Sequence, residues 1–235
     1  MRLKDRPLVD FLLLEYLWNR NFAVGLESYA HPKKFFESNN LIHHGLDMET
    51  LVERLSSLLE DGMFLLNREH FHSGIQKIYL NKEELKNYLV NKSSPFNSAI
   101  EYPPIYIRLS FKGGKTWEQT VQADWSKYYT HLGLSTRDIR LESTNKHFLS
   151  KVLNFYLDNL ILASDCNVKL TTFKPWFPYT VHWKQFARGY QYQFKVLKES
   201  FSREALSELQ KLKIWRHIWV KNEDKGLMLI KPEVK

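Results

Sequence analysis

The chain has 235 residues, of which 43% are hydrophobic and 14% aromatic, enough to fill the core of one large domain or two small ones. Its 34 Lys and Arg against 26 Asp and Glu give a net charge of +8, which favours an anionic partner, either a nucleic acid or an acidic protein surface. No apolar run approaches the roughly 18 residues of a membrane-spanning helix, and the single cysteine, Cys166, excludes an intrachain disulfide framework and a cysteine-based zinc site. Because Asp10 and Glu15 interrupt the apolar stretch after the basic N-terminus, that stretch does not match a signal peptide. One thiol is compatible with a reducing compartment, so we expect a cytoplasmic protein with no membrane segment.

The first half of the chain is predicted to be mainly helical, with two short strands. Side chains that accept hydrogen bonds from a first helical turn mark helix starts at Asp47, at Asn81 with Glu84 in the capping-box position, and at Ser110. Gly113 and Gly114, in the turn after Ser110, each cost a helix about 1 kcal/mol relative to alanine, which suggests either close backbone packing or a loose first turn there. The predicted helices are residues 7–22, 47–60, 81–90 and 110–121, the last extending toward 128, and the predicted strands are residues 63–66 and 105–109.

The second half mixes helices with strands. Alternating apolar residues predict a half-buried strand over 190–197, and Ser202 is placed to cap a helix. A boundary near Gly133 would divide the chain into residues 1–133 and 134–235, either as two domains or as two halves that share one core. The other predicted elements are a helix over 143–164, strands over 167–172 and 179–183, and a hairpin of 215–220 with 227–230.

The order of the predicted elements in residues 1–133 is that of a winged helix. Residues 58–64 resemble the junction where a recognition helix ends at a glycine and the first wing strand begins, and residues 106–114 resemble the second wing strand running into a capped helix. About forty residues separate these two strands, far more than a hairpin loop uses, and the helix over 81–90 falls within that insertion. We therefore predict an α+β fold, with a winged-helix-like N-terminal half and a C-terminal half of helices and antiparallel strands.

Two motifs extend this resemblance over most of the chain. Gly113-Gly114-Lys115-Thr116-Trp117-Glu118 and Asp124-Trp125-Ser126-Lys127-Tyr128 look like a pattern in uncharacterised bacterial proteins that join a winged-helix-like half to an aromatic-rich half. Trp176, Trp183-Lys184-Gln185 and Gly189-Tyr190 resemble the second half of those proteins. The family carries no assigned chemistry. Some proteins of this kind are similar to immunity proteins that accompany bacterial toxins.

No pattern in the sequence predicts a catalytic residue, a metal site or a cofactor. The pairs His43-His44 and His70-Phe71-His72 could bind a metal only if their loops met, and Cys166 lacks the flanking signature of a nucleophile. The run Gly113-Gly114-Lys115-Thr116 has Leu109 where a phosphate-binding loop needs its first glycine. We therefore expect a protein that is not an enzyme.

Aromatic and basic residues gather between residues 174 and 192. Aromatic side chains with arginine are typical of protein-interface hot spots, and they are also used to stack the bases of single-stranded nucleic acids. The alternative is a strand face packed on the helix over 143–164, with its lysines pointing outward. The candidate partner-binding residues are Trp176, Tyr179, Trp183, Lys184, Arg188 and Tyr190.

Three functions compete for this chain. The favoured hypothesis is a non-enzymatic immunity protein that neutralises a toxin by direct protein binding, although a charge of +8 opposes it if the toxin is a basic nuclease. The second is a winged-helix DNA-binding regulator with the helix over 47–60 in the major groove. That helix carries Glu49, Glu53 and Glu60 against Arg54, a poor balance for approaching phosphates. The third is an enzyme of unrecognised type.

Overall fold

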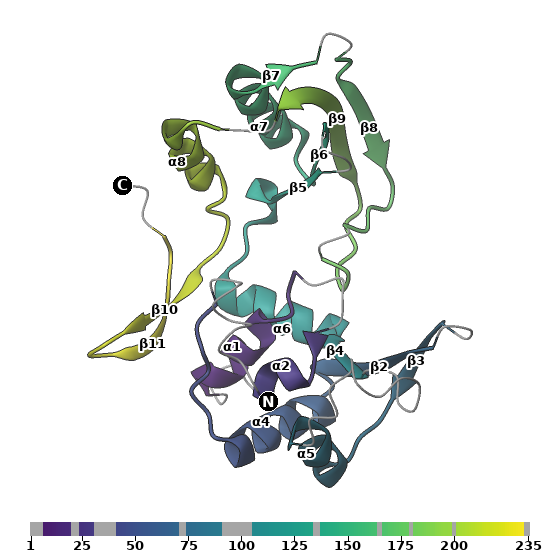
Figure 1. The fold of residues 1–235 in the computed structure, drawn as a ribbon, viewed down its shortest axis with the longest axis vertical. Coiled ribbons are helices and arrows are strands. Elements are labelled where there is room, and N and C mark those ends of the chain that lie inside the picture. The colour runs from purple at the N-terminus through teal and green to yellow at the C-terminus, as the bar shows by residue number, and fades with distance from the viewer. Residues whose placement is uncertain are drawn as a thin grey trace. The chain divides into compact units, whose positions relative to one another are not determined.

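A computed structural model describes residues 7–19, 24–30, 41–70, 74–90, 105–133, 137–163, 166–178, 181–198 and 201–232. The chain divides into two compact units, unit 1 (residues 1–120 and 219–228) and unit 2 (residues 121–218 and 229–235) (Figure 1). Each unit combines helices with an antiparallel sheet, so the predicted α+β class is confirmed. The division falls earlier than the predicted boundary near Gly133, because residues 129–133 form a strand that pairs within unit 2.

Unit 1 is built around a short buried helix. Every residue from Asp10 to Leu17 is buried, although the helix itself ends at Glu15 and the described part of the predicted 7–22 helix continues as a turn. Residues 20–22 of that prediction lie outside the described residues. The helices of this unit are α1 (Leu8–Glu15), α2 (Glu27–Ala30), α4 (Met48–Glu60), α5 (Lys82–Val90) and α6 (Phe111–Val121, whose last residue is counted in unit 2).

The predicted helix starts are confirmed by hydrogen bonds. The Asp47 side chain accepts from the Thr50 amide at 2.8 Å, and Asn81 and Glu84 form the reciprocal capping box at 2.9 and 2.8 Å. The Ser110 hydroxyl accepts from the Gly113 amide at 2.9 Å and donates to the Gly62 carbonyl at 2.6 Å. The bond from Ser110 to Gly62 joins the start of α6 to the end of α4.

Of the two alternatives for the glycines at the start of α6, the structure favours close backbone packing, at Gly113. A Cβ atom at this position would overlap the carbonyl oxygen of Met63. That same oxygen accepts a hydrogen bond from the Ser110 amide at 3.0 Å. The glycine is therefore required for α6 to pack on the chain that leaves α4.

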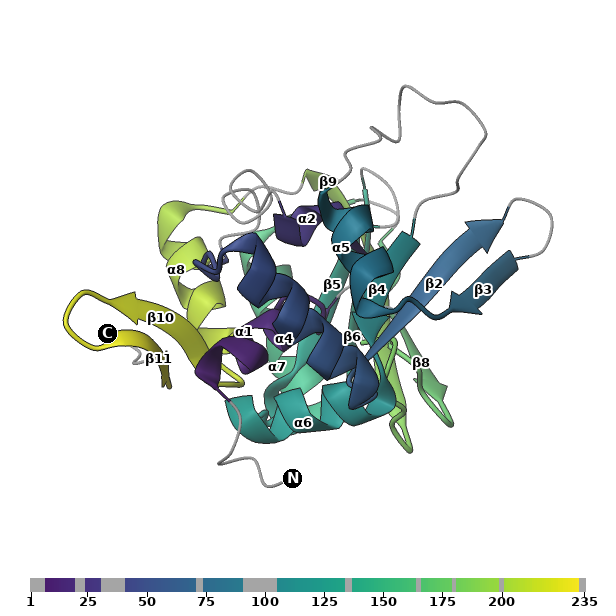
Figure 2. The ribbon, with the colours of Figure 1, turned by 90° about the horizontal axis from the view of Figure 1, so that it is seen from below.

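The sheet of unit 1 differs from the predicted two-stranded wing. Strand β2 (Phe64–His70) does pair with β4 (Ile105–Leu109), as predicted, with Phe64 opposite Leu109. It also turns directly into β3 (Gly74–Ile78), so the insertion begins with a third strand, and β1 (Val24–Gly25) pairs with the far side of β4. Figure 2 shows β2 and β3 extending together as a hairpin beside β4. Because β2 is longer than the predicted strand, its second half is available to pair with β3.

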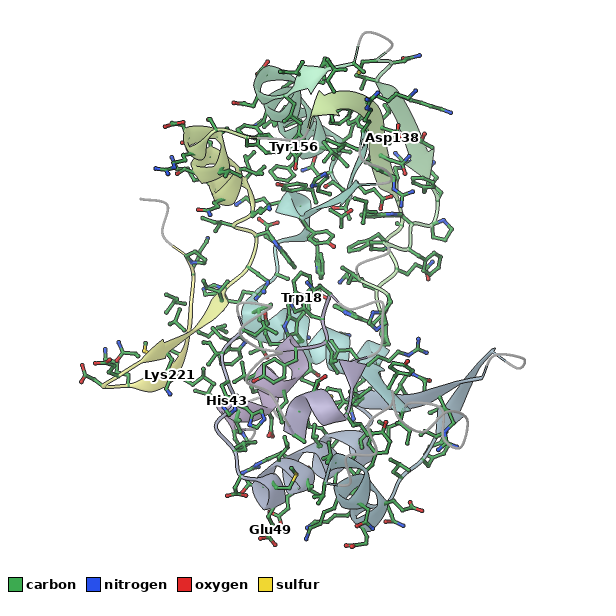
Figure 3. The ribbon with its side chains drawn as sticks, in the orientation of Figure 1. Trp18, His43, Glu49, Asp138, Tyr156 and Lys221 are labelled. Atoms are coloured by element: carbon green, nitrogen blue, oxygen red, sulfur yellow. The ribbon has the colours of Figure 1, made fainter. Side chains whose placement is uncertain are left out.

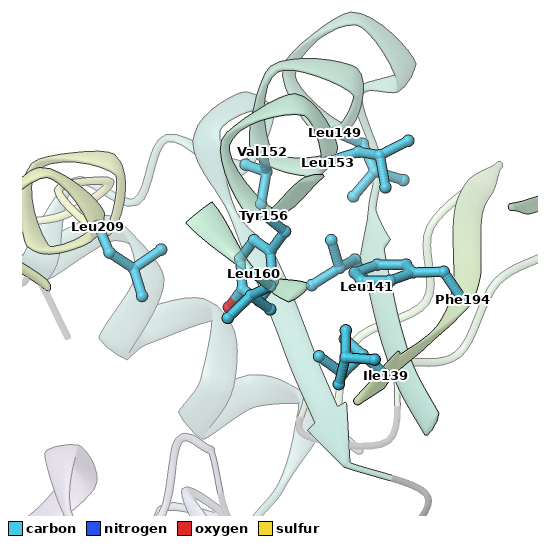
Figure 4. Close-up of a cluster of buried hydrophobic side chains, with 10 residues drawn as sticks. Ile139, Leu141, Leu149, Val152, Leu153, Tyr156, Leu160, Phe194 and Leu209 are labelled. Atoms are coloured by element: carbon cyan, nitrogen blue, oxygen red, sulfur yellow. The ribbon is translucent and has the colours of Figure 1, made fainter. Parts of the chain in front are cut away.

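Unit 2 contains a second antiparallel sheet, covered on one face by a helix. Its strands are β5 (Tyr129–Gly133), β6 (Asp138–Ser143), β9 (Gly189–Lys198), β7 (Ile161–Leu162) and β8 (Lys169–Phe173), in the order β5-β6-β9, with β7 and β8 each paired to β9. Helix α7 (Lys146–Asn159) packs against β6 and β9, and α8 (Arg203–Leu212), capped by Ser202 as predicted, packs against α7. Figure 4 shows the resulting core, in which Tyr156 of α7 lies among Ile139, Leu160 and Phe194.

Two predictions for the second half were wrong in their boundaries or type. The helix predicted over 143–164 is α7, which is capped by Asn145 and ends at Asn159, because Ser143 closes β6 and its hydroxyl bonds the Tyr128 carbonyl at 2.6 Å. The strand predicted over 179–183 is absent where it is described. Residues 181–185 form turns and irregular chain, held by short-range bonds such as Lys184 N to Val181 O at 3.0 Å.

The C-terminal hairpin is present, with β10 (Ile218–Asn222) and β11 (Gly226–Ile230) joined by a tight turn. Gly226 has a φ of +70°, which glycine adopts without strain. Most of this hairpin, residues 219–228, is grouped with unit 1, a long-range return that the division at residue 133 did not include. In the part of the chain that the structure describes, no helix is both long and apolar enough to cross a membrane.

Candidate functional site

The structure separates the predicted partner-binding residues into buried and exposed ones. The side chains of Trp176 and Trp183 are only 4% and 7% exposed, so they belong to the interior of unit 2. Lys184 and Tyr190 are half-buried and Arg188 is exposed. The remaining candidate, Tyr179, lies outside the described residues.

Trp125 occupies the centre of an aromatic cluster in unit 2. It begins the short 3-10 helix η2 (Trp125–Lys127), which Asp124 caps through the Ser126 amide at 3.2 Å. Four rings surround the Trp125 indole with centroids between 5.0 and 6.0 Å away. We call this group the aromatic cluster, and its members are Trp125, Tyr128, Trp183, Phe186 and Trp215. Trp125, Tyr128 and Trp215 were not among the predicted candidates, because they are distant from residues 174–192 in the chain.

Lys184 is held by this cluster through cation–π contacts. Its Nζ lies 4.9 Å from the Trp125 ring centroid, 5.4 Å from that of Phe186 and 5.8 Å from that of Trp183. An ammonium over several rings stabilises their arrangement by about 0.5–1 kcal/mol at an exposed site and more when it loses water. We infer that Lys184 fastens the chain around residue 184 to η2.

Trp176 anchors the neighbouring loop in the same interior. Its backbone exchanges two hydrogen bonds with Phe186, both 2.9 Å long, and the two rings stack at 5.4 Å. A Cβ atom at Gly189 would overlap the Trp176 ring, so the indole packs directly on the start of β9. The Trp176 side chain also hydrogen-bonds the buried carboxylate of Glu142.

Glu142 is a buried acid on the sheet face that lies opposite α7. Burial raises the pKa of its carboxyl, and the charge of Arg140 and the hydrogen bond from Trp176 act in the opposite direction. The Arg140 Nε lies 3.1 Å from Glu142 Oε1. This buried group thus ties Trp176 to the sheet and stabilises the loop from within.

The two loops that the Trp176–Phe186 bridge joins are residues 174–178 and 184–188, and each exposes side chains on its outward side. In an extended segment successive side chains point to opposite sides, so Phe177 faces outward where Trp176 faces inward. Phe177 is 63% exposed, and the Arg188 guanidinium donates to the Tyr190 hydroxyl at 3.3 Å. We call this surface the loop platform, and its exposed residues are Lys174, Pro175, Phe177, Gln185 and Arg188.

The net charge of the chain belongs to unit 2, which carries this platform. Residues 166–198, which run from just before β8 to the end of β9, contain six Lys and Arg and no Asp or Glu. Unit 1 has 17 Lys and Arg with 17 Asp and Glu, and unit 2 has 17 with 9, so the entire net charge of +8 lies in unit 2. A search for runs of like charge misses this feature, whereas a search for long stretches without acids would have found it.

The helix predicted to recognise DNA presents an acidic face. Glu49, Glu53 and Glu60 of α4 are exposed, and Figure 3 shows the Glu49 side chain projecting away from the helix. The single basic residue of α4, Arg54, lies with its Nε 3.9 Å from the buried carboxylate of Asp10. The charge on the outside of this helix therefore repels phosphates.

His44 has a structural role. Its Nδ1 accepts from the Leu46 amide at 2.9 Å and its Nε2 lies 3.0 Å from the Tyr29 carbonyl, which assigns the proton to Nε2. Burial lowers the pKa of this imidazole. In the neighbouring His43, Nδ1 accepts from the Gly45 amide at 2.8 Å. The side chains of the second histidine pair lie outside the described residues, and the described ones contain no group of three His, Cys, Asp or Glu placed to hold a metal ion.

Comparisons of the chain with protein-family models, with curated proteins and with solved structures found no match.

Proposed function

We propose that this chain is a non-enzymatic binding protein and that the loop platform of unit 2 contacts an acidic surface of a partner protein. One observation carries the proposal: Phe177 is exposed, and it lies with the exposed Lys174 and Arg188 on loops that the buried Trp176 and the aromatic cluster hold in place. Exposed aromatic residues with arginine on a rigid support are the composition of interface hot spots. A preorganised surface also loses less entropy on binding than a loose one.

The burial of the tryptophans favours a protein over a single-stranded nucleic acid. Binding single strands needs several exposed rings on which successive bases stack. Trp176 and Trp183 are buried. In the described part of the two loops, Phe177 is the one large aromatic side chain that is mostly exposed. The exposed Lys174 and Arg188 can pair with carboxylates on the surface of a partner protein.

A bacterial toxin is the partner class that we propose, because some proteins of the kind that the chain resembles are similar to immunity proteins. The charge of unit 2 specifies the kind of toxin surface involved. An inhibitor with 17 Lys and Arg against 9 Asp and Glu in its binding unit is complementary to an acidic surface and would be repelled by the basic active site of a nuclease.

The test uses the toxin-sized product of a neighbouring gene, co-expressed with this chain. A stable one-to-one complex is expected on size exclusion, and calorimetry should show Phe177→Ala and Arg188→Ala each weakening it about ten-fold or more. Phe111→Ala is the matched control, since Phe111 is equally exposed but belongs to unit 1, and it should bind normally. Normal binding by both platform variants would exclude the loop platform as the contact surface.

Duplex DNA binding is a second candidate function. The direct succession of α4 and the hairpin β2–β3 favours it, because a winged helix places its recognition helix and wing in that order. The exposed carboxylates of α4 count against it. Tight duplex binding that weakens steeply with salt, and further weakens in Lys77→Ala on β3, would favour this function over the first.

A further inference from the structure

Strand β8 is an edge strand with one side of its backbone available. It pairs with β9 from Lys169 opposite Gln193 to Phe173 opposite Gly189. The other short strand on this side of β9, β7, pairs with a different part of it, near Lys198. Among the residues that the structure describes, β8 makes no backbone pairing besides that with β9 (Figure 1). Its outward amides and carbonyls can therefore form hydrogen bonds with another strand.

The two faces of this edge differ in chemistry. One face of the sheet is the face on which α7 packs. On this face Leu170 of β8 lies in register with Tyr192 of β9 and Leu141 of β6. Leu170 is nevertheless 40% exposed, because β8 is the last of the described strands on its side of the sheet. On the opposite face, Lys169 is exposed and lies in register with Gln193 and Arg140. A strand added here would place alternate residues beside an apolar side chain, Leu170, and beside a cation, Lys169.

We propose that an extended acidic segment of the partner protein adds to unit 2 as a strand along β8. The proposal rests on the proposed function, and it specifies how the partner is recognised. The segment alternates apolar residues, which cover Leu170, with carboxylates, which face Lys169. At the end of β8 the segment reaches Lys174, so that its acidic residues meet the loop platform.

The same charges disfavour a second copy of this chain as the occupant. Two copies paired edge to edge would bring together two stretches of 33 residues, 166–198, that each carry six Lys and Arg and no acid. Like charges across a strand pair are destabilising. An acidic strand, in contrast, is attracted by the positive charges along the same edge.

The experiment uses the full chain and a fluorescent peptide of about eight residues that alternates valine and glutamate. Fluorescence anisotropy should show binding, which weakens about ten-fold or more in Lys169→Glu and is unchanged in the control Lys146→Glu, an exposed position on α7. A peptide with lysine in place of glutamate should not bind.

Two further peptides test the strand pairing itself. Along an extended chain all valine amides point to one side and all glutamate amides to the other. Methylating one set of amide nitrogens should therefore abolish binding, and methylating the other set should leave it close to that of the parent peptide. Equal binding of both methylated peptides, or failure of the parent peptide to bind, would overturn strand addition. In that case the proposed function would still stand if Phe177→Ala and Arg188→Ala weakened the toxin complex. If neither variant weakened the complex, the proposed function would fail together with strand addition.

Discussion

Replacing Trp176 by alanine tests whether this tryptophan is part of the interior or of a binding surface. The indole is 4% exposed, stacks on Phe186, packs on Gly189 and hydrogen-bonds the buried Glu142. Truncating a buried tryptophan to alanine costs about 3–5 kcal/mol. Losing the indole hydrogen bond to Glu142, whose carboxylate keeps the Arg140 guanidinium beside it, adds about 1 kcal/mol. We therefore expect Trp176→Ala to lower the free energy of unfolding by about 4 kcal/mol or more, a large part of the 5–15 kcal/mol typical of a domain.

The assay is urea denaturation followed by circular dichroism, with Phe177→Ala as the matched control. Phe177 is the next residue in the chain and is 63% exposed, so its truncation should change stability by less than about 0.5 kcal/mol. We therefore expect Trp176→Ala to lower stability and Phe177→Ala to weaken partner binding. If Trp176→Ala unfolds within about 1 kcal/mol of the wild type, the packing described around this indole is wrong.

Two other predictions follow from the same structure. Gly113→Ala should destabilise the protein by about 1–3 kcal/mol in thermal unfolding, despite the better helix propensity of alanine, because the new Cβ overlaps the Met63 carbonyl; a gain in stability would contradict this. Burial raises the pKa of the Glu142 carboxyl in the folded protein, so the folded state binds more protons than the unfolded state near that pKa. The contribution of Glu142 to stability is therefore fully present below its ordinary pKa of 4.5 and is lost as the pH rises through the raised folded value. Denaturation at a series of pH values should show this dependence in the wild type and its loss in Glu142→Gln; an unchanged dependence would show that another group causes it.

Features that depend on short-range contacts were predictable from the sequence. The caps at Asp47, Asn81, Ser110 and Ser202 each accept from the amide three residues further along, and all four were found at the predicted positions. Gly113 and Gly114 indicated either close packing or a loose first turn, because a glycine in a first helical turn has a local cost, but the sequence did not identify Met63 as the neighbour that decides between the two.

The sequence predicted which region of the chain contains the candidate site, but not which side chains of that region are exposed. Aromatic and basic residues between 174 and 192 marked the region, but composition does not distinguish a buried ring from an exposed one. The division between Trp176 and Phe177 depends on a bridge to Phe186 and on a glycine at 189. The central residue of the cluster, Trp125, comes from an element some fifty positions earlier in the chain.

By itself, the sequence determined the α+β class, four of the helix starts, the lack of acids in residues 166–198 and the acidic character of α4. These properties belong to single residues or to neighbours along the chain. Only the tertiary structure decided that β2 turns into β3, that the excess charge belongs to unit 2, that Trp176 and Trp183 are buried, and that β8 is the last strand on its side. Each of these depends on which distant segments pair and pack, because pairing determines which side chains lose contact with water and which remain available to a partner.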